Sequence, residues 1–200
     1  MRTKLTYLDY VALPEDGKRY ELIDGVLIEM AAPAIKHQII CDELGGQLRV
    51  AMVAKPLVDG VCQFFSAPVD IRLPTKGTTP DCAQTVVQPD LCVYCEPSNY
   101  DGKGGKCAPD FAIEILSPSS ITHDRVRKLK LYEAHGFKVY WIVDGDQRTM
   151  RVYRQDGEQF APVETFAFDC QVPVRSVPGL SLDLAQLARV LDRAERIAQI

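Results

Sequence analysis

Glu114 is the first residue whose setting points to chemistry, because it interrupts the apolar run 111–116. An unpaired carboxylate buried in a strand is costly, so this glutamate needs a partner or a function. A salt bridge or an edge strand with one wet face would explain it. A metal ligand or catalytic acid explains it better if a second acid can be placed beside it, and this is the interpretation we favour.

Distance along and between strands selects that second acid. Asp110 shares a strand face with Glu114 but lies roughly 13 Å along the strand, too far to share one ion. Asp90 begins another apolar strand and can lie roughly 5 Å away if the two strands are neighbours. Two carboxylates with a backbone carbonyl and waters form an oxygen site that suits Mg²⁺ or Mn²⁺. Asp70 ranks lower, because Arg72 on the same face offers it an ordinary ion pair.

A lysine in the helix that follows Glu114 could reach the same place. Asp124 and Lys128 are spaced i, i+4, which would support an exposed helix face by a few tenths of a kcal/mol. On a helical wheel, however, Lys128 borders the inward arc formed by Val126, Leu129 and Tyr132. We therefore expect its amine to turn towards a site over the sheet.

Hydrophobic patterning indicates the elements that would position these residues. Asp24-Gly25 predicts a tight hairpin, because both turn positions favour positive φ, and its register sets Glu21 opposite Ile28. Periodicity predicts helices at 36–54, 122–135 and 182–200, and strands at 61–65, 69–73, 91–95, 111–116, 139–143, 150–154 and 165–168. This order predicts an α/β fold in which one mixed sheet is flanked by helices.

Composition restricts the class of protein. The chain has 200 residues, 46% of them hydrophobic and 25% charged, as expected of one folded domain over 1–200. Its net charge of −4 argues against coating nucleic acid by bulk electrostatics. The N-terminus lacks a signal-peptide core and no apolar run approaches the ~18 residues of a membrane span, so we expect a cytoplasmic protein with no membrane partner. The seven irregularly spaced cysteines are expected to be reduced thiols.

Short motifs, in order along the chain, resemble a known family. Pro89-Asp90 followed by Glu114 resembles the paired acids of the PD-(D/E)XK nuclease superfamily. A closer resemblance, to the Uma family of restriction-endonuclease-like proteins, rests on Arg-Tyr-Glu-Leu-Ile-Asp-Gly (19–25), Pro-Asp-Leu (89–91), Glu-Ile-Leu-Ser-Pro-Ser (114–119), Asp-Arg-x-x-Lys-x-x-x-Tyr (124–132) and Tyr-Trp-Ile-Val-Asp (140–144). This resemblance runs from about residue 7 to 185.

The resemblance implies a restriction-endonuclease-like core that hydrolyses phosphodiester bonds of nucleic acid, with DNA the expected substrate. Asp90 and Glu114 would hold Mg²⁺ or Mn²⁺. The superfamily pattern places a lysine at position 116, where this chain has Leu116. In the Uma family that lysine lies on the following helix and matches Lys128, and Glu21 matches an acid near the N-terminus. The implied catalytic residues are Asp90, Glu114, Lys128 and Glu21.

Other interpretations stay open. Leu116 and the acidic balance favour a nuclease-like module that binds nucleic acid or a protein without cutting. Cys92 and Cys95 have the spacing of a zinc knuckle, but on a strand they point to opposite faces and suit small buried residues better. His37 is expected to be a solvated first-turn residue. The final helix at 182–200 could cover the sheet or form a homodimer contact.

Overall fold

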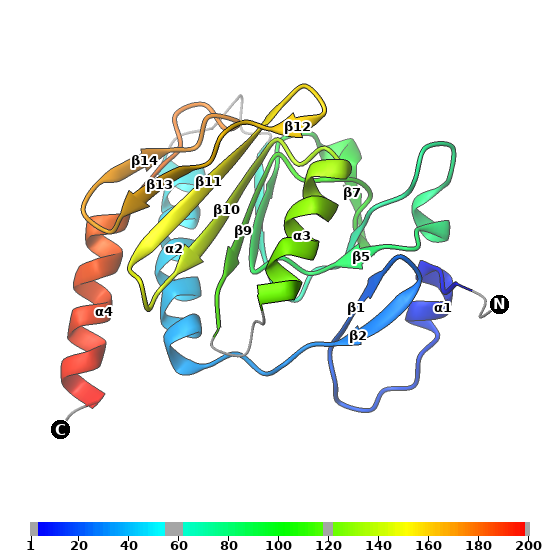
Figure 1. Ribbon diagram of the computed structural model, residues 1–200, viewed down its shortest axis with the longest axis horizontal. Coiled ribbons are helices and arrows are strands. Elements are labelled where there is room, and N and C mark those ends of the chain that lie inside the picture. The colour runs from blue at the N-terminus through cyan, green and yellow to red at the C-terminus, as the bar shows by residue number, and fades with distance from the viewer. Residues whose placement is uncertain (1–3, 55–61, 118–121, 199–200) are drawn as a thin grey trace.

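A mixed sheet lies between helices in this protein, whose computed structural model describes residues 4–54, 62–117 and 122–198 (Figure 1). Positions 118 and 119 of the predicted Ser-Pro-Ser motif lie outside the described residues, and so does the side chain of Asp124. None of the helices in the described segments is long and apolar enough to cross a membrane.

The central sheet runs in the order β12-β11-β10-β9-β6-β3, and β13 pairs with β11. Its strands are β3 (Gln63–Ser66), β6 (Leu91–Tyr94), β9 (Phe111–Ile115), β10 (Val139–Asp144), β11 (Thr149–Asp156), β12 (Gln159–Phe160) and β13 (Glu164–Ala167). β9 and β10 are parallel and are joined through α3 (Thr122–Ala134), whereas β6 is antiparallel to β9. The predicted mixed α/β fold is therefore confirmed.

A second sheet holds the N-terminal hairpin, so the expectation of one sheet is wrong. Its order is β2-β1-β5-β4-β8-β7. The strands are β1 (Tyr20–Ile23), β2 (Val26–Glu29), β4 (Ile71–Arg72), β5 (Val86–Val87), β7 (Tyr100–Asp101) and β8 (Gly104–Gly105). Most of them are too short to give a periodic pattern. The hairpin itself forms as predicted, with φ of 52° at Asp24 and 76° at Gly25 and with Glu21 opposite Ile28.

Helices cover both faces of the central sheet, with α2 (Ile35–Ala54) on one side and α3 on the other (Figure 1). Alternate residues of β10 point to the two faces of the sheet and pack against α2 on one face and α3 on the other. Trp141 belongs to the cluster that contains Leu44 of α2, and Tyr140 to the cluster that contains Tyr132 of α3. Because both faces of β10 are covered, its run of apolar residues is continuous.

The C-terminal helix covers the sheet beside α2, which is one of the two alternatives predicted for it. The 182–200 helix begins late, because Ser181–Asp183 form β15, which pairs with β14 (Gln171–Pro173). α4 (Leu184–Ala198) buries Leu184, Leu187 and Leu191. The remaining short elements are α1 (Tyr7–Val11), η1 (Pro80–Cys82) and η2 (Pro97–Asn99).

The cysteine prediction needs one correction, because Cys62 and Cys95 are joined by a disulfide. The register of β3 and β6 explains the pairing. Gln63 is opposite Tyr94, so the next positions outward are Cys62 and Cys95. Cys92, on the buried strand β6, is free and fully buried, so the described structure places these residues in no zinc knuckle.

Candidate active site

Asp90 and Glu114 lie opposite each other where β6 begins and β9 ends. The β6–β9 register pairs Leu91 with Ile113, and one further step sets Asp90 against Glu114. Asp90 Oδ2 accepts a hydrogen bond of 2.7 Å from the Ile115 backbone N–H. β6 and β9 are thus neighbours, which is the condition under which the two acids can lie together, and both acids occupy the sheet face covered by α3.

Asp110 lies towards the opposite end of β9 and is engaged there. Its Oδ2 accepts from the Cys95 backbone N–H at 2.7 Å, and its Oδ1 accepts from Lys138 Nζ at 2.5 Å. Asp110 therefore belongs to a separate ion pair, as the distance along the strand predicts.

Lys128 enters the site from α3 and bridges two glutamates. Its Nζ lies 3.0 Å from Glu114 Oε1 and 3.0 Å from Glu21 Oε1. The lysine is only 9% exposed, whereas Val126, which the helical wheel placed on the inward arc, is 50% exposed. The helix is thus rotated so that Lys128 faces the sheet together with Tyr132, whose hydroxyl donates to Glu114 Oε1 at 2.7 Å.

Glu21 reaches this cluster from the second sheet. Its side chain is almost fully buried, and Oε1 also accepts a 2.9 Å hydrogen bond from the Gln88 backbone N–H. β1 positions it by pairing with β5, where Leu22 is opposite Val86. The site therefore lies where the two sheets meet: the central sheet supplies Asp90 and Glu114, and the second sheet supplies Glu21.

His37 is a site residue that the sequence interpretation placed wrongly. Its side chain is 10% exposed, not solvated, and Nε2 lies 3.1 Å from Asp90 Oδ2. Its Nδ1 is buried without a hydrogen-bond partner among the described residues. The first turn of α2 packs over the end of the central sheet, which a pattern of helical periodicity cannot reveal. No motif in the sequence around His37 indicated that its side chain would contact Asp90.

The charges in this cluster shift one another's protonation. Burial, helped by the carboxylates of Asp90 and Glu21, raises the pKa of Glu114 to about 7, against the opposing influence of Lys128. Burial by itself would lower the pKa of Lys128, but the adjacent Glu114 and Glu21 carboxylates raise it above its ordinary value. The ammonium thus stays charged, and Glu114 holds a proton more readily than an ordinary glutamate does.

These residues line a cavity of about 270 Å³, which we call the acidic cavity; it includes Glu21, His37, Asp90, Glu114 and Lys128. Among the described residues no group of three or more His, Cys, Asp and Glu side chains is arranged to hold a metal by itself. Mg²⁺, however, usually takes only one or two carboxylates and completes its shell with waters and substrate phosphate. The oxygen donors of Asp90 and Glu114 fit that requirement.

The expected Asp70–Arg72 ion pair is absent from the described structure. Arg72 instead donates to Asp101 at 2.6 Å and to Asp81 at 3.3 Å. Asp70 Oδ1 accepts from Gln88 Nε2 at 2.8 Å. Strand spacing predicted only that Asp70 and Arg72 share a face of their strand. The partner that Arg72 binds instead, Asp101, lies in the β7–β8 hairpin, which the sequence analysis did not predict.

The paired acids beside a buried lysine, on a mixed sheet between helices, define a nuclease-like α/β fold. A solved structure with this fold is a "putative nuclease belonging to DUF820" from Anabaena variabilis, at a TM-score of 0.71 and 24% identity over 94% of this chain and 99% of that one. Residues 7–185 match the Uma2 family, described as "putative restriction endonuclease". The chain belongs to this family. A relative, the "uncharacterized protein slr1290" of Synechocystis, is 23% identical over 191 residues, 94% of this chain and 93% of that protein.

Proposed function

We propose that this protein is a metal-dependent endonuclease that hydrolyses phosphodiester bonds of nucleic acid, with DNA the expected substrate. Family membership supports a nuclease function in general terms. The observation that carries the specific proposal is the convergence of Asp90, Glu114 and Lys128 on one cavity, from β6, β9 and α3.

Asp90 and Glu114 would hold Mg²⁺ or Mn²⁺. When bound, such an ion polarises the phosphoryl oxygen and lowers the pKa of water. Ile115 contributes by fixing Asp90, because its backbone N–H holds one carboxylate oxygen in place. The Glu114 carboxylate must lose its proton for this role, and the nearby ammonium of Lys128 favours that loss.

Lys128 would stabilise the negative charge that develops on the phosphate. Its ammonium is already desolvated, so it need not shed a hydration shell when substrate binds, and such preorganised charges act strongly in a dry site. Glu21 positions it, because Glu21 Oε1 is fixed between Gln88 N–H and Lys128 Nζ. Lys128, on α3, would thus take the role of the lysine that the superfamily pattern places at position 116, where this chain has leucine.

His37 would act as a positioning residue through Asp90. With its Nε2 protonated, the ring donates to Asp90 Oδ2 and restricts how that carboxylate can rotate. Groups that orient a metal-binding carboxylate in this way commonly influence metal affinity without contacting the ion.

A non-cutting nucleic-acid or protein-binding module is the second candidate, and Leu116 is the observation that favours it. Both functions predict binding, but only the nuclease predicts strand scission that needs the acids. A cleavage assay therefore distinguishes the two candidate functions, whereas a binding measurement does not.

The direct test is to incubate purified protein with supercoiled plasmid, linear duplex, single-stranded DNA and RNA in Mg²⁺ or Mn²⁺. We expect cleavage of DNA that is lost in Asp90→Asn and in Glu114→Gln. Asp156→Asn, an exposed acid at the end of β11, is the matched control and should cut as the wild type does. Cleavage that survives in both site variants, or no cleavage of any substrate, would overturn the proposal.

A further inference from the structure

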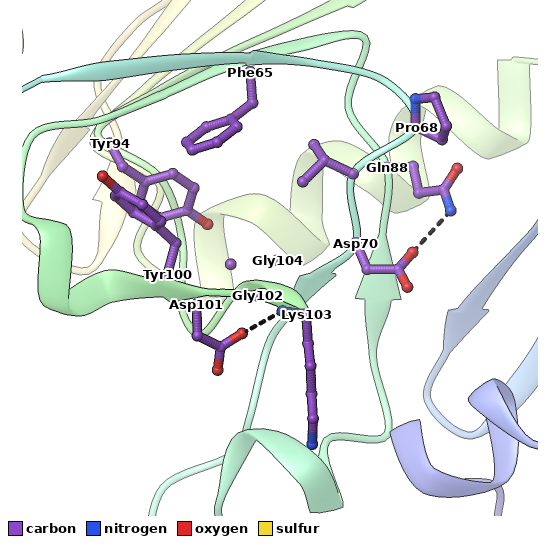
Figure 2. A pocket seen from close by; sticks show the side chains of 12 residues that line it. Phe65, Pro68, Asp70, Gln88, Tyr94, Tyr100, Asp101, Gly102, Lys103 and Gly104 are labelled. Atoms are coloured by element: carbon purple, nitrogen blue, oxygen red, sulfur yellow. Dashed lines mark hydrogen bonds between the residues drawn. The ribbon is translucent and has the colours of Figure 1, made fainter.

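A second cavity, of about 400 Å³, lies next to the acidic cavity and has a different character. Figure 2 shows Phe65, Tyr94 and Tyr100 gathered on one side of it and Asp70 and Gln88 on the other. We call it the aromatic cavity. Its volume falls in the range of small-molecule sites, which are typically about 300–1,000 Å³ and combine an apolar wall with a few polar groups.

The aromatic wall is a connected unit. The ring centroids of Phe65 and Tyr100 are 5.1 Å apart and those of Tyr94 and Tyr100 are 5.8 Å apart. Tyr94 is anchored, because its hydroxyl donates to the Cys107 carbonyl at 2.6 Å. Gly104, at φ 120°, brings the β7–β8 turn against the Asp70 backbone, where a Cβ would overlap the Asp70 carbonyl oxygen. The turn that carries Tyr100 is thus fixed next to the wall that carries Asp70.

The polar wall is suited to a hydrogen-bond donor. Asp70 Oδ1 accepts from Gln88 Nε2 at 2.8 Å and from the Tyr10 hydroxyl at 3.2 Å, while within the described residues Oδ2 accepts no hydrogen bond. Lys103 borders the cavity, but its Nζ donates to Asp81 instead. A free carboxylate oxygen repels phosphate and attracts neutral N–H donors, because an ionised carboxylate only accepts hydrogen bonds.

The two cavities are lined by neighbouring residues of the chain. Ala67 lines the acidic cavity and Pro68 lines the aromatic one. Gln88 links them as well: its backbone N–H holds Glu21, and its side chain holds Asp70 and accepts from Arg19 of the acidic cavity. A nucleotide with its phosphate in the acidic cavity could therefore place its base in the aromatic one.

We propose that the aromatic cavity binds a nucleobase turned out of the nucleic-acid strand, with guanine preferred, an inference that rests on the proposed nuclease function. The flat base would stack on the aromatic wall, as unstacked bases do in proteins that bind single strands. Guanine presents two adjacent N–H donors on its Watson–Crick edge, and both can be directed at Asp70 Oδ2, whereas adenine and cytosine offer one exocyclic amine beside a ring-nitrogen acceptor that the carboxylate repels. Uracil and thymine, which present a carbonyl on each side of one N–H, fit it least.

The test uses uncharged guanosine and uridine without metal, so that its result is independent of the phosphate site. Titrations followed by NMR chemical shifts should show guanosine bound about tenfold more tightly than uridine, and this binding should survive in Asp90→Asn. Tyr100→Leu should weaken guanosine binding by about tenfold, whereas Tyr100→Phe, which keeps the ring, should bind as the wild type does. Tyr153→Leu, a partly buried tyrosine outside both cavities, is the matched control.

Photolabelling of the wild-type protein with 8-azidoguanosine provides a test that does not depend on how any variant folds. The adduct should map to the 65–70 or 100–105 segments and be prevented by excess guanosine. No guanosine binding, or an adduct elsewhere, overturns the base-binding proposal while leaving metal-dependent cleavage to stand by itself. Binding of tetramethylammonium in place of guanosine would likewise overturn it and assign the cavity to organic cations. Guanosine binding without any cleavage would instead defeat the proposed nuclease function.

Discussion

Arg72 and Lys128 are both buried cations, but their surroundings differ in a way that separates structure from chemistry. The Arg72 guanidinium is held by two carboxylates and two backbone carbonyls, those of Asp101, Asp81, Gly104 and Gly105. It also lies over the ring of Tyr7, 5.1 Å from its centroid. The acids around it are about two-fifths exposed, at 39% and 43% of their side-chain surface. Water therefore helps to neutralise the acids, and four of the five guanidinium N–H groups donate to a partner in the protein.

Lys128 is surrounded by more negative charge than it can neutralise. Glu21 and Glu114 both bind its Nζ, and Asp90 contributes a third carboxylate close enough to raise the pKa of Glu114. The side chains of these acids are at most 16% exposed, much less than those around Arg72, and they line a cavity. A buried excess of carboxylate beside open space is an unbalanced charge, and a divalent cation would balance it. This is the difference that marks a candidate site rather than a structural ion pair.

The largest expected effect is on metal affinity, and it should be confined to the Lys128 cluster. Asp90→Asn with Glu114→Gln should weaken Mn²⁺ binding by about a thousandfold, because both anionic donors are lost. Asp81→Asn removes a carboxylate of similar geometry from Arg72 and should leave Mn²⁺ binding unchanged. Isothermal titration with Mn²⁺ measures all three proteins. Equal losses in both clusters would contradict the distinction between them.

The next effect is on stability, and it should be confined to the Arg72 cluster. Arg72→Met removes the side chain that donates to the Gly104 and Gly105 carbonyls and to the Asp101 carboxylate, which keeps only its hydrogen bond from the Lys103 backbone N–H among the described residues. We expect the free energy of unfolding to fall by about 3 kcal/mol, since unsatisfied buried acceptors are costly but Asp101 can recover some hydration. Urea denaturation measures the loss, and added Mn²⁺ should not reduce it. A loss that Mn²⁺ restores would show that Arg72 shares the metal site.

Lys128→Met should behave in the opposite way, because it removes the only cation hydrogen-bonded to Glu21 and Glu114 among the described residues. We expect a fall of about 2 kcal/mol at pH 8 without metal, which is moderated because Glu114 can take up a proton. Burial raises the pKa of Glu114 to about 7 even with Lys128 present, and removing the ammonium that lowers this pKa raises it further. The native state then binds more protons than the unfolded state, so stability falls as pH rises from the ordinary glutamate range through the folded pKa. The loss should therefore shrink towards pH 5 and also shrink with Mn²⁺ at pH 8. Denaturation of Lys128→Met and wild type at both pH values, with and without Mn²⁺, measures this. A loss that neither acid nor Mn²⁺ relieves would contradict an excess of carboxylate.

The main chemical residues were predictable because each violates a local pattern. Glu114 interrupts an apolar strand, Asp90 opens another, and Lys128 borders an apolar helix face. Strand spacing showed that the two acids could lie together if their strands were neighbours, and the pairing of β6 with β9 meets that condition. The hairpin was predictable for a similar reason, because Asp24-Gly25 has few alternatives to a tight turn with positive φ.

Contacts between segments distant in the chain were not predictable from such patterns. Two-residue strands such as β5 and β8 have no period, so the second sheet and the partners of Arg72 stayed hidden. His37 was misplaced for the same reason: its helix position suggested solvent, but docking of α2 over the sheet end buries it against Asp90. Cys62 and Cys95 likewise needed the register of β3 and β6 before their pairing could be seen. The aromatic cavity was not predictable either, because its lining comes from four segments that are separate in the sequence.

The smallest effect we expect tests whether His37 belongs to the cluster with excess charge. His37→Asn removes the ring that contacts Asp90 Oδ2 and should weaken Mn²⁺ binding by about tenfold, the lower end for residues that orient a metal-binding group. His135, whose Nδ1 lies 2.8 Å from the Leu131 carbonyl near the end of α3, offers a matched substitution outside the cavity. His135→Asn should leave Mn²⁺ affinity unchanged even if it lowers stability slightly. Because the His37 contact restricts only the rotation of Asp90, His37→Gln, which keeps a long donor, should recover part of the affinity. If His37→Asn and His135→Asn bind Mn²⁺ equally well, the histidine contributes packing alone, and the cluster's excess charge is organised by Ile115 and Lys128 without it.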